Sequence, residues 1–257
     1  MVENQNNKSL MQNQNLIENR EFLKSIWAKV DFKNSDQAKK MPIPKQQKDL
    51  KEDQIENKSA KIPLITRENW SKIEVDLIEL ICNRKSTRKY KFEQLSILLY
   101  CTQGIRKYYP DYSFRTVPSA GARHPFETYF YANKVENLDK GIYRYLPIDN
   151  AIVLEIPYYD GIERDLHEAT LEQFWNPAIF FFWSAIPYRT EWRYLNAAHK
   201  AIALDAGHLC QNLYVAAEAL GCGVCAIAAY DQQKIDKLLK LDGIDEFIVY
   251  CASAGKK

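Results

Sequence analysis

The stretch that decides the fold spans residues 189–231 and reads RTEWRYLNAAHKAIALDAGHLCQNLYVAAEALGCGVCAIAAYD. Residues 192–220 of this stretch predict one continuous helix that ends at Gly221. At 1.5 Å per residue, about 29 residues would extend roughly 43 Å, which exceeds the width of a small domain. Apolar residues occur on more than one side of this helix. We therefore expect it in the centre of the core, at a dimer interface, or in both roles at once.

Apolar runs on both sides of the long helix predict strands, and helical patterns separate them. Upstream, the expected elements are a helix at 73–83, a turn at 84–90, a helix at 92–102 ending at Gly104, a strand at 128–132, a hairpin of 141–145 and 151–156, a helix at 166–175 and a strand at 178–186. Downstream, they are a strand at 224–229, a helix at 232–239 and a strand at 247–252. This alternation predicts a layered α/β or α+β domain.

Length and composition narrow the class of protein. The chain has 257 residues, of which 46% are hydrophobic and 26% charged, with a net charge of +2. That near balance predicts neither nucleic acid nor an anionic membrane as a partner. The N-terminus lacks an apolar secretory segment, and no apolar run has the length of a membrane span. With six cysteines and no export signal, we expect free thiols and a cytoplasmic location.

Composition also divides the chain. Residues 1–60 contain 15 Asn plus Gln and resemble a polar N-terminal arm that cannot bury a core of its own, whereas residues 61–257 form the predicted domain. Within the arm, an amphipathic helix is expected from the spacing of its apolar residues, which are Phe22, Leu23, Ile26, Trp27 and Val30. Such a helix would dock on its own domain, on a second subunit or on another partner.

Two motifs could bind an anionic, flat ligand. Residues 84–88 read RKSTR, in which Arg84 and Arg88 flank Ser86 and could converge on a phosphate. Residues 117–125 read VPSAGARHP, a run of small residues that lets main-chain amides approach a ligand closely. Taken singly, each motif is more often a solvated surface or an ordinary turn. The histidines have no metal-ligand spacing, and no metal is expected.

Together these stretches resemble the nitroreductase-like FMN flavoproteins, and most closely the SagB-type dehydrogenases. The resemblance rests on RKSTRKY, FEQLSILLYCTQGI, RTVPSAGARHPFETYFY, KGIYRY and the stretch at 189–231, in that order. It covers roughly residues 62–257 and leaves the arm outside. It implies an α+β nitroreductase-like fold, with a central, mostly antiparallel sheet flanked by helices and a long central helix at the interface of a homodimer.

The resemblance also implies a cofactor and its site. Arg84, Ser86 and Arg88 would bind the phosphate and ribityl chain of FMN. The flavin ring would contact Pro118, Ser119, Ala120 and Gly121 from the other subunit, and the main chain of 226–229, including Ala228 and Ala229. Lys256 would add a phosphate contact.

The resemblance implies a reaction as well. SagB-type enzymes oxidise azoline rings in peptides, and azoline-oxidising members carry a Lys-Tyr pair at the start of the long helix. Here Arg193 and Tyr194 occupy that place. An arginine stays protonated, so it cannot replace the lysine as a base. Either Tyr194 carries the proton alone, or Arg193 only orients the substrate, or the azoline reaction is lost. To ionise, Tyr194 would need a cation beside it, and we expect Arg189 or Arg123 rather than Arg193, because neighbours on a helix point apart. The alternative is a tyrosine that packs in the core.

Three functions stay open at this point. The first is a SagB-type dehydrogenase that transfers a hydride between bound flavin and a small organic or modified-peptide substrate. The second is an NAD(P)H-dependent reductase of nitro or quinone compounds. The third is a flavin-binding scaffold without catalysis. The sequence favours the first.

Overall fold

The computed structural model of the chain describes residues 29–56, 61–72 and 90–256. The helix expected at 73–83 and all but the last residue of the turn at 84–90 lie outside these ranges, as does most of the amphipathic segment around Trp27.

A seven-stranded sheet forms the centre of the domain. Its strand order is β1-β6-β5-β4-β7-β9-β8, and every neighbouring pair is antiparallel. The strands are β1 (Lys61–Pro63), β4 (Phe126–Ala132), β5 (Gly141–Leu146), β6 (Ala151–Pro157), β7 (Ile179–Ala185), β8 (Cys222–Ile227) and β9 (Phe247–Lys256). A separate hairpin consists of β2 (Ile105–Tyr108) and β3 (Ser113–Arg115). The predicted α+β class with an antiparallel sheet is confirmed.

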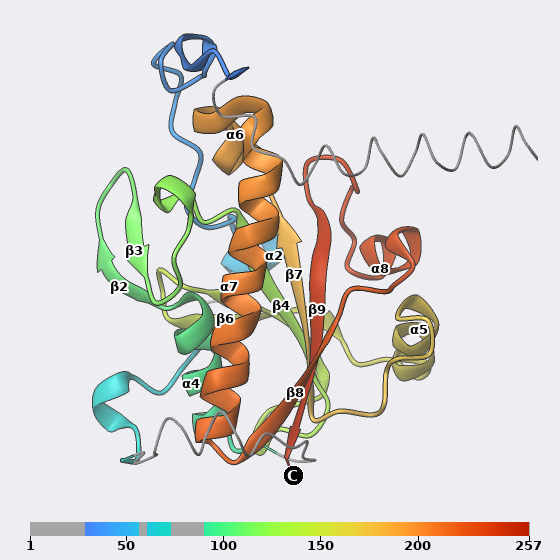
Figure 1. Cartoon of the computed structure of the whole chain (residues 1–257). Helices are drawn as coiled ribbons and strands as arrows, with labels where there is room; N and C mark the ends of the chain where they lie inside the picture. The colour runs from blue at the N-terminus through green and yellow to red at the C-terminus, as the bar shows by residue number, and fades with distance from the viewer. Residues whose placement is uncertain (1–28, 57–60, 73–89, 257) are drawn as a thin grey trace, which may run out of the picture.

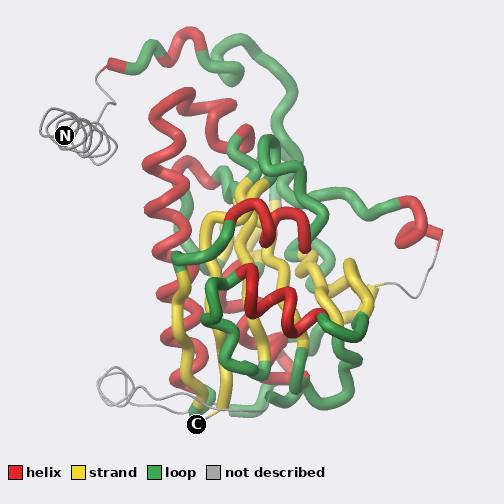
Figure 2. Tube along the Cα trace, turned by 90° about the vertical axis from the view of Figure 1, so that its right-hand side faces the viewer, coloured by secondary structure: helices red, strands yellow, loops and turns green. Residues whose placement is uncertain are grey.

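Helices cover both faces of the sheet. On one face lie α4 (Phe92–Gln103) and α7 (Ala198–Ala219), and on the other lie α5 (Ile162–Ala169) and α8 (Gln232–Leu238), as Figures 1 and 2 show. The interior strand β7 is buried along its whole length because it serves two cores. Phe181 packs on the α4–α7 side, while Phe180 and Phe182 pack on the α5–α8 side, as the period of two in a strand requires.

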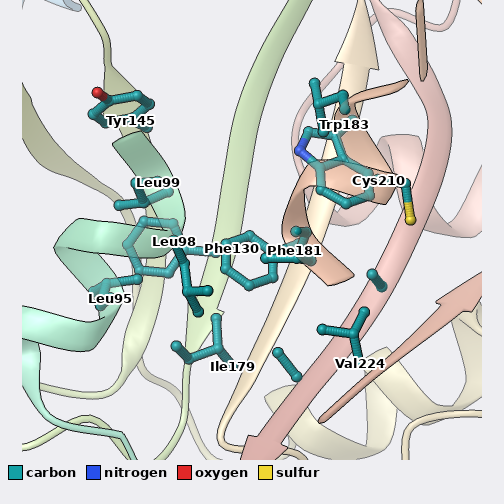
Figure 3. Packing of buried hydrophobic residues seen from close by; sticks show 14 of the residues in the cluster. Leu95, Leu98, Leu99, Phe130, Tyr145, Ile179, Phe181, Trp183, Cys210 and Val224 are labelled. Atoms are coloured by element: carbon teal, nitrogen blue, oxygen red, sulfur yellow. The ribbon is translucent and has the colours of Figure 1, made fainter. Parts of the chain in front are cut away.

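Aromatic rings fill the core under α4 and α7. Figure 3 shows leucines of α4 packed towards Phe130 of β4, with Phe181 and Trp183 of β7 beside it. The ring centroids of Phe130 and Phe181 lie 6.1 Å apart, and Phe181 stacks on Trp183 at the same separation. Such pairs add specific geometry to the area that they bury.

The predicted long central helix is confirmed as α7 (Ala198–Ala219), but the prediction that it runs continuously from residue 192 is wrong. Helix α6 (Tyr188–Tyr194) ends at Leu195, whose φ of 50° and ψ of −136° are not helical, and α7 follows after a short 3-10 turn, η5 (Leu195–Ala197). The main-chain oxygen of Trp192 accepts a hydrogen bond from the amide of Gln37 at 2.9 Å. In a continuous helix this carbonyl would accept a hydrogen bond from the amide four residues further along the chain. The arm therefore takes the place of that helical hydrogen bond.

Smaller differences have local causes. The helix expected at 166–175 is α5, which begins at Ile162 and ends at Ala169, because Leu171 and Glu172 have left-handed φ values of 49° and 66°. Strand β8 ends at Ile227, two residues earlier than expected. The expected hairpin is confirmed as β5 and β6, and the expected helix at 92–102 as α4.

Part of the polar arm packs on the domain. The segment with η2 (Phe32–Asn34) lies beside α6 (Figure 1), where Asp36 accepts a hydrogen bond from the hydroxyl of Tyr188 at 2.7 Å. A second segment leads to α2 (Glu52–Glu56), in which Gln54 is buried and donates to the main chain of β6. The boundary at residue 60 stays a prediction. None of the helices among the described residues combines the length and apolar composition of a membrane span.

Candidate active site

A cavity of about 870 Å³ lies where the β2–β3 hairpin, the loop at 116–124 and α6 meet. In Figure 1 the hairpin and this loop lie on one side of α7, with α6 at the end of that helix. The described lining is Gln37, Ile43, Arg106, Asp111, Tyr112, Phe114, Arg115, Thr116, Val117, Pro118, Ser119, Gly121, Ala122, Arg123, His124, Trp192 and Arg193. Three predicted loop residues and the predicted Arg193 thus share one cavity.

The loop of small residues has an unusual main chain. Gly121, Ala122 and His124 all adopt left-handed φ values, of 57°, 54° and 47°. A residue with a Cβ pays for this conformation, so such positions persist only where surrounding contacts determine them. Here the hydroxyl of Ser119 accepts from the amide of His124 at 2.9 Å, and the carbonyl of Ser119 accepts from the amide of Ala122 at 3.0 Å.

Asp205 of α7 anchors the same loop. Its carboxylate accepts from the hydroxyl of Ser119 at 2.6 Å and from the amide of Ala120 at 3.1 Å. Burial raises the pKa of the Asp205 carboxyl. Our reading of the sequence missed this residue. The available signal was a carboxylate on the buried face of the long helix, three residues after Ile202 and four before Leu209.

Tyr194 meets this loop at Gly121. A Cβ built on Gly121 would lie 2.4 Å from the hydroxyl oxygen of Tyr194 and 3.2 Å from Cδ of Arg193. The glycine thus leaves room for two residues that are distant in sequence, and the structure brings the two motifs together within one chain. The alternative of core packing holds for the Tyr194 ring, which is partly buried against the main core cluster and makes an edge contact with Phe32.

Our expectation that Arg193 points away from Tyr194 is wrong. The Arg193 guanidinium carbon lies 5.3 Å from the centre of the Tyr194 ring, because α6 ends at Tyr194 and regular helical spacing no longer applies. Arg123 also interacts electrostatically with both residues, and its guanidinium stacks over Trp192 at 5.1 Å. Burial, together with the charge of Arg193, lowers the pKa of Arg123.

Arg189, the other cation expected beside Tyr194, has a different partner. Its Nη2 lies 2.5 Å from Oε1 of buried Glu127, which also pairs with Arg144 at 3.4 Å. Burial alone would raise the pKa of Glu127, but Arg189 and Arg144 outweigh it and hold that pKa below its usual range. The arm completes this cluster, since the amide of Lys48 donates to Glu127 at 2.9 Å. Arg189 also donates to the carbonyl of His124 at 3.4 Å, so the cluster contacts a residue of the cavity wall.

His124 and Arg115 form the buried wall of the cavity. Burial and the charge of Arg115 lower the pKa of His124 to about 2, so its imidazole is neutral. The ring nitrogen Nε2 lies 3.1 Å from the carbonyl of Ser113, and we assign the proton to that nitrogen. Burial, followed by the charge of Arg189, lowers the pKa of Arg115 to about 10.

The remaining predicted residues lie elsewhere. Ala228 and Ala229 follow β8 and are exposed, and the loop that contains them leads to α8 on the other side of α7 from the β2–β3 hairpin (Figure 1). Lys256 ends β9, where its main chain pairs with Cys222. The phosphate residues Arg84, Ser86 and Arg88 lie outside the described part of the chain. The structure therefore assembles only part of the predicted site within one chain.

The loop fits a flat flavin ring by its shape. Pro118 is exposed, and Gly121 and Ala122 are half-buried, so a planar group can approach main chain without meeting large side chains. The hydroxyl of Ser119 and the amide of Ala120 are engaged by Asp205. The loop thus offers contact surface rather than free donors. Across the described ranges, no group of three or more His, Cys, Asp or Glu side chains could hold a metal ion.

Comparisons with known proteins bear on the expected family. The profile of the Nitroreductase family matches residues 81–256. A protein of Methanocaldococcus jannaschii whose name assigns it to the nitroreductases is 28% identical over 192 residues, which are 72% of this chain and 92% of that protein. The expected family is confirmed, while the SagB branch stays a prediction.

Solved structures share the fold. A crystal structure from Anabaena variabilis, whose name assigns it to the nitroreductases, superimposes with a TM-score of 0.59 at 25% identity. The match covers 70% of this chain but spans only 38% of that one. A chain of the Escherichia coli microcin synthetase McbBCD complex, with truncated pro-MccB17 bound, gives a TM-score of 0.58 at 18% identity and covers 82% of this chain and 83% of that one. At that identity the likeness shows the fold alone.

Proposed function

The chain belongs to the nitroreductase family, and from that premise we propose that it is an FMN-dependent oxidoreductase that acts as a homodimer. Proteins of this family generally bind FMN. More specifically, we propose a SagB-type dehydrogenase that transfers a hydride between flavin and a small organic or modified-peptide substrate. Bound FMN would supply the hydride chemistry, and the protein would supply binding, orientation and charge.

The close approach of Gly121 and Tyr194 is the observation that supports this proposal most. It places a phenol hydroxyl at the loop that fits the flavin ring, 2.4 Å from where a side chain on Gly121 would begin. In the proposed enzyme, Tyr194 moves a proton at its hydroxyl oxygen. Two cations lie beside this residue: the Arg193 guanidinium carbon is 5.3 Å from the centre of the Tyr194 ring, and Arg123 interacts electrostatically with Tyr194.

The outer face of α7 supports a dimer. Leu204 is 57% exposed and Val215 is 36% exposed, and Ala203 and Gly207 of the same helix are also exposed. Small and apolar residues on one helix face favour close packing against a second helix. The loop at 118–121 and the segment that leads from β8 to α8 lie on opposite sides of α7 (Figure 1), so a site that uses both would need two chains.

The loss of the family lysine supports a second function, an NAD(P)H-dependent reductase of nitro or quinone compounds. Arg193 stands where azoline oxidases carry the lysine, and a reductase needs no such base. The two functions differ in the hydride donor. We expect the purified protein to be yellow. Slow flavin bleaching by NADH and NADPH without oxygen, with fast bleaching by an azoline peptide, supports the dehydrogenase, whereas rapid bleaching by either nucleotide favours the reductase.

A Tyr194→Phe variant tests the role of the tyrosine. We expect turnover to fall at least tenfold while FMN stays bound, since general acid–base groups contribute about 10²–10⁴-fold. Tyr188→Phe is the matched control, because Tyr188 lies on the same helix and its hydroxyl bonds Asp36 of the arm instead of the loop. Undiminished turnover in Tyr194→Phe would identify a packing residue and favour the reductase. A colourless protein that takes up no FMN would refute the FMN-dependent function, whereas a yellow protein that none of these hydride donors reduces would identify the flavin-binding scaffold.

A further inference from the structure

The cavity beside the loop carries an excess of positive charge. Four arginines line it, Arg106, Arg115, Arg123 and Arg193, and Asp111 is the single acidic residue in its described lining. In the described part of the chain, no ion pair neutralises any of the four guanidinium groups. The cavity therefore has the electrostatic character of an anion-binding site.

Arg115 is built into the cavity wall with part of its hydrogen-bonding capacity unused. The residue is 4% exposed. Its Nη1 donates to the side chain of Gln103 at 2.9 Å, and its Nη2 donates to the carbonyl of Gln46 at 2.6 Å. Its buried Nε has no partner among the described residues. Its hydrogen-bond partners are neutral, and the nearby anion that stabilises its charge is buried Glu127, which does not line the cavity.

Arg123 is held in place in the same way. Its Nε donates to the carbonyl of Gly121 at 3.2 Å, and its Nη2 donates to the carbonyl of Asp111 at 3.3 Å. The guanidinium lies over the ring of Trp192, which fixes its plane. These contacts orient the group without cancelling its charge. A planar guanidinium held in this way is suited to a planar oxyanion.

The loop favours a carboxylate over a phosphate. Phosphate sites commonly use a series of free main-chain amides. Here Asp205 engages the amide of Ala120, and acceptors within the loop engage the amides of Ala122, Arg123 and His124. What the cavity still offers is guanidinium groups, and no lysine lines its described part.

Aromatic rings complete the cavity. Tyr112 is half-buried and Phe114 is 47% exposed, and their ring centroids lie 5.4 Å apart at the rim. We propose that this cavity binds an organic substrate that carries a carboxylate next to a flat ring, with the carboxylate at Arg115 and Arg123 and the ring against Tyr112 and Phe114. The inference rests on the proposed function only in taking the bound acid to be the substrate.

A pair of isosteric ligands tests the charge preference. The oxidised protein as purified is titrated by calorimetry with 4-nitrobenzoate and with 4-nitrobenzamide, which have similar shape and differ in charge. Without a reductant no turnover occurs, so the titration reports binding alone. We expect the acid to bind about tenfold tighter or more, as a charge-assisted contact predicts, and the preference to fall at high salt. Equal affinities would overturn the proposal.

Variants locate the contact. Arg123→Gln should reduce the preference for the acid about tenfold and leave the affinity for 4-nitrobenzamide nearly unchanged. Arg164→Gln is the matched control, because Arg164 is an exposed arginine of α5 outside the cavity lining. Equal preference in wild type and Arg123→Gln would refute the assignment to Arg123. If inorganic phosphate displaces 4-nitrobenzoate at comparable concentration, the site binds phosphate rather than a carboxylate, and the proposal is overturned.

Two further experiments are needed. One identifies the source of the carboxylate, and the other distinguishes failure of this proposal from failure of the proposed function. N-acetylphenylalanine and its amide repeat the charge comparison with a peptide carboxylate, and tighter binding than 4-nitrobenzoate would identify a peptide end as the source. A protein without flavin that still prefers the acids would refute the proposed function and retain this site. A yellow, active protein without that preference would support the proposed function and refute this site.

Discussion

Replacing Gly121 with alanine tests the central contact of the site. A Cβ at this position would lie 2.4 Å from the Tyr194 hydroxyl oxygen and 3.1 Å from Cζ of the same ring. Contacts this short do not persist, so either the Tyr194 ring or the loop must move. Gly121 also has a φ of +57°, which alanine adopts only with strain.

The expected cost follows from these two effects. A left-handed φ costs an L-residue about 1–2 kcal/mol, and the lower entropy of the unfolded alanine chain offsets about 0.4–1 kcal/mol of that. Moving the Tyr194 side chain off its rotamer adds about 0.5–1.5 kcal/mol. We therefore expect Gly121→Ala to lower the free energy of unfolding by about 0.5–3 kcal/mol.

Gly221→Ala is the matched control. Gly221 has a φ of +66°, but a Cβ there would meet no atom within 4 Å, so it carries the backbone strain without the clash. Urea denaturation of both variants should show the larger loss for Gly121→Ala. Turnover should fall at least tenfold in that variant and stay near wild type in Gly221→Ala. Equal stability and equal turnover in the two variants would refute the close approach of Tyr194 to the loop.

Three further substitutions test the surroundings of the loop. Asp205→Asn removes the charge that accepts from the Ala120 amide, and we expect a loss of about 1–2 kcal/mol in urea denaturation together with faster hydrogen exchange at that amide. His124→Gln should make stability less sensitive to acid. The folded pKa of about 2 lies below the unfolded value of about 6.5, so the unfolded chain binds a proton first and stability falls as the pH drops below 6.5, by about 2 kcal/mol at pH 5. A wild-type and variant pair with the same pH dependence would contradict this. Glu127→Gln leaves buried Arg189 without its anion and should cost about 3–5 kcal/mol, measured as a lower denaturation midpoint; a change below about 1 kcal/mol would show that the pair is not buried as described.

The sequence by itself determined most of the local structure. The apolar runs at 141–145 and 151–156 predicted the β5–β6 hairpin, and the apolar run at 178–186 predicted the fully buried strand β7. The helical period at 92–102 predicted α4. These features depend on neighbours a few residues apart, which a sequence pattern records directly. The PSAG motif likewise indicated the loop of the candidate site, because small residues at adjacent positions are visible without coordinates.

Only the tertiary structure decided which distant groups meet. The arm supplies the amide of Gln37 that pairs with the carbonyl of Trp192 at the break between α6 and α7, and it supplies the carbonyl of Gln46 to buried Arg115. Asp205 meets a loop 86 positions earlier in the chain. A polar group in the interior must find a partner, but its sequence position does not say which one. Composition alone therefore predicted only that the arm is polar. In the folded protein, main-chain carbonyls of the arm accept hydrogen bonds from buried arginines.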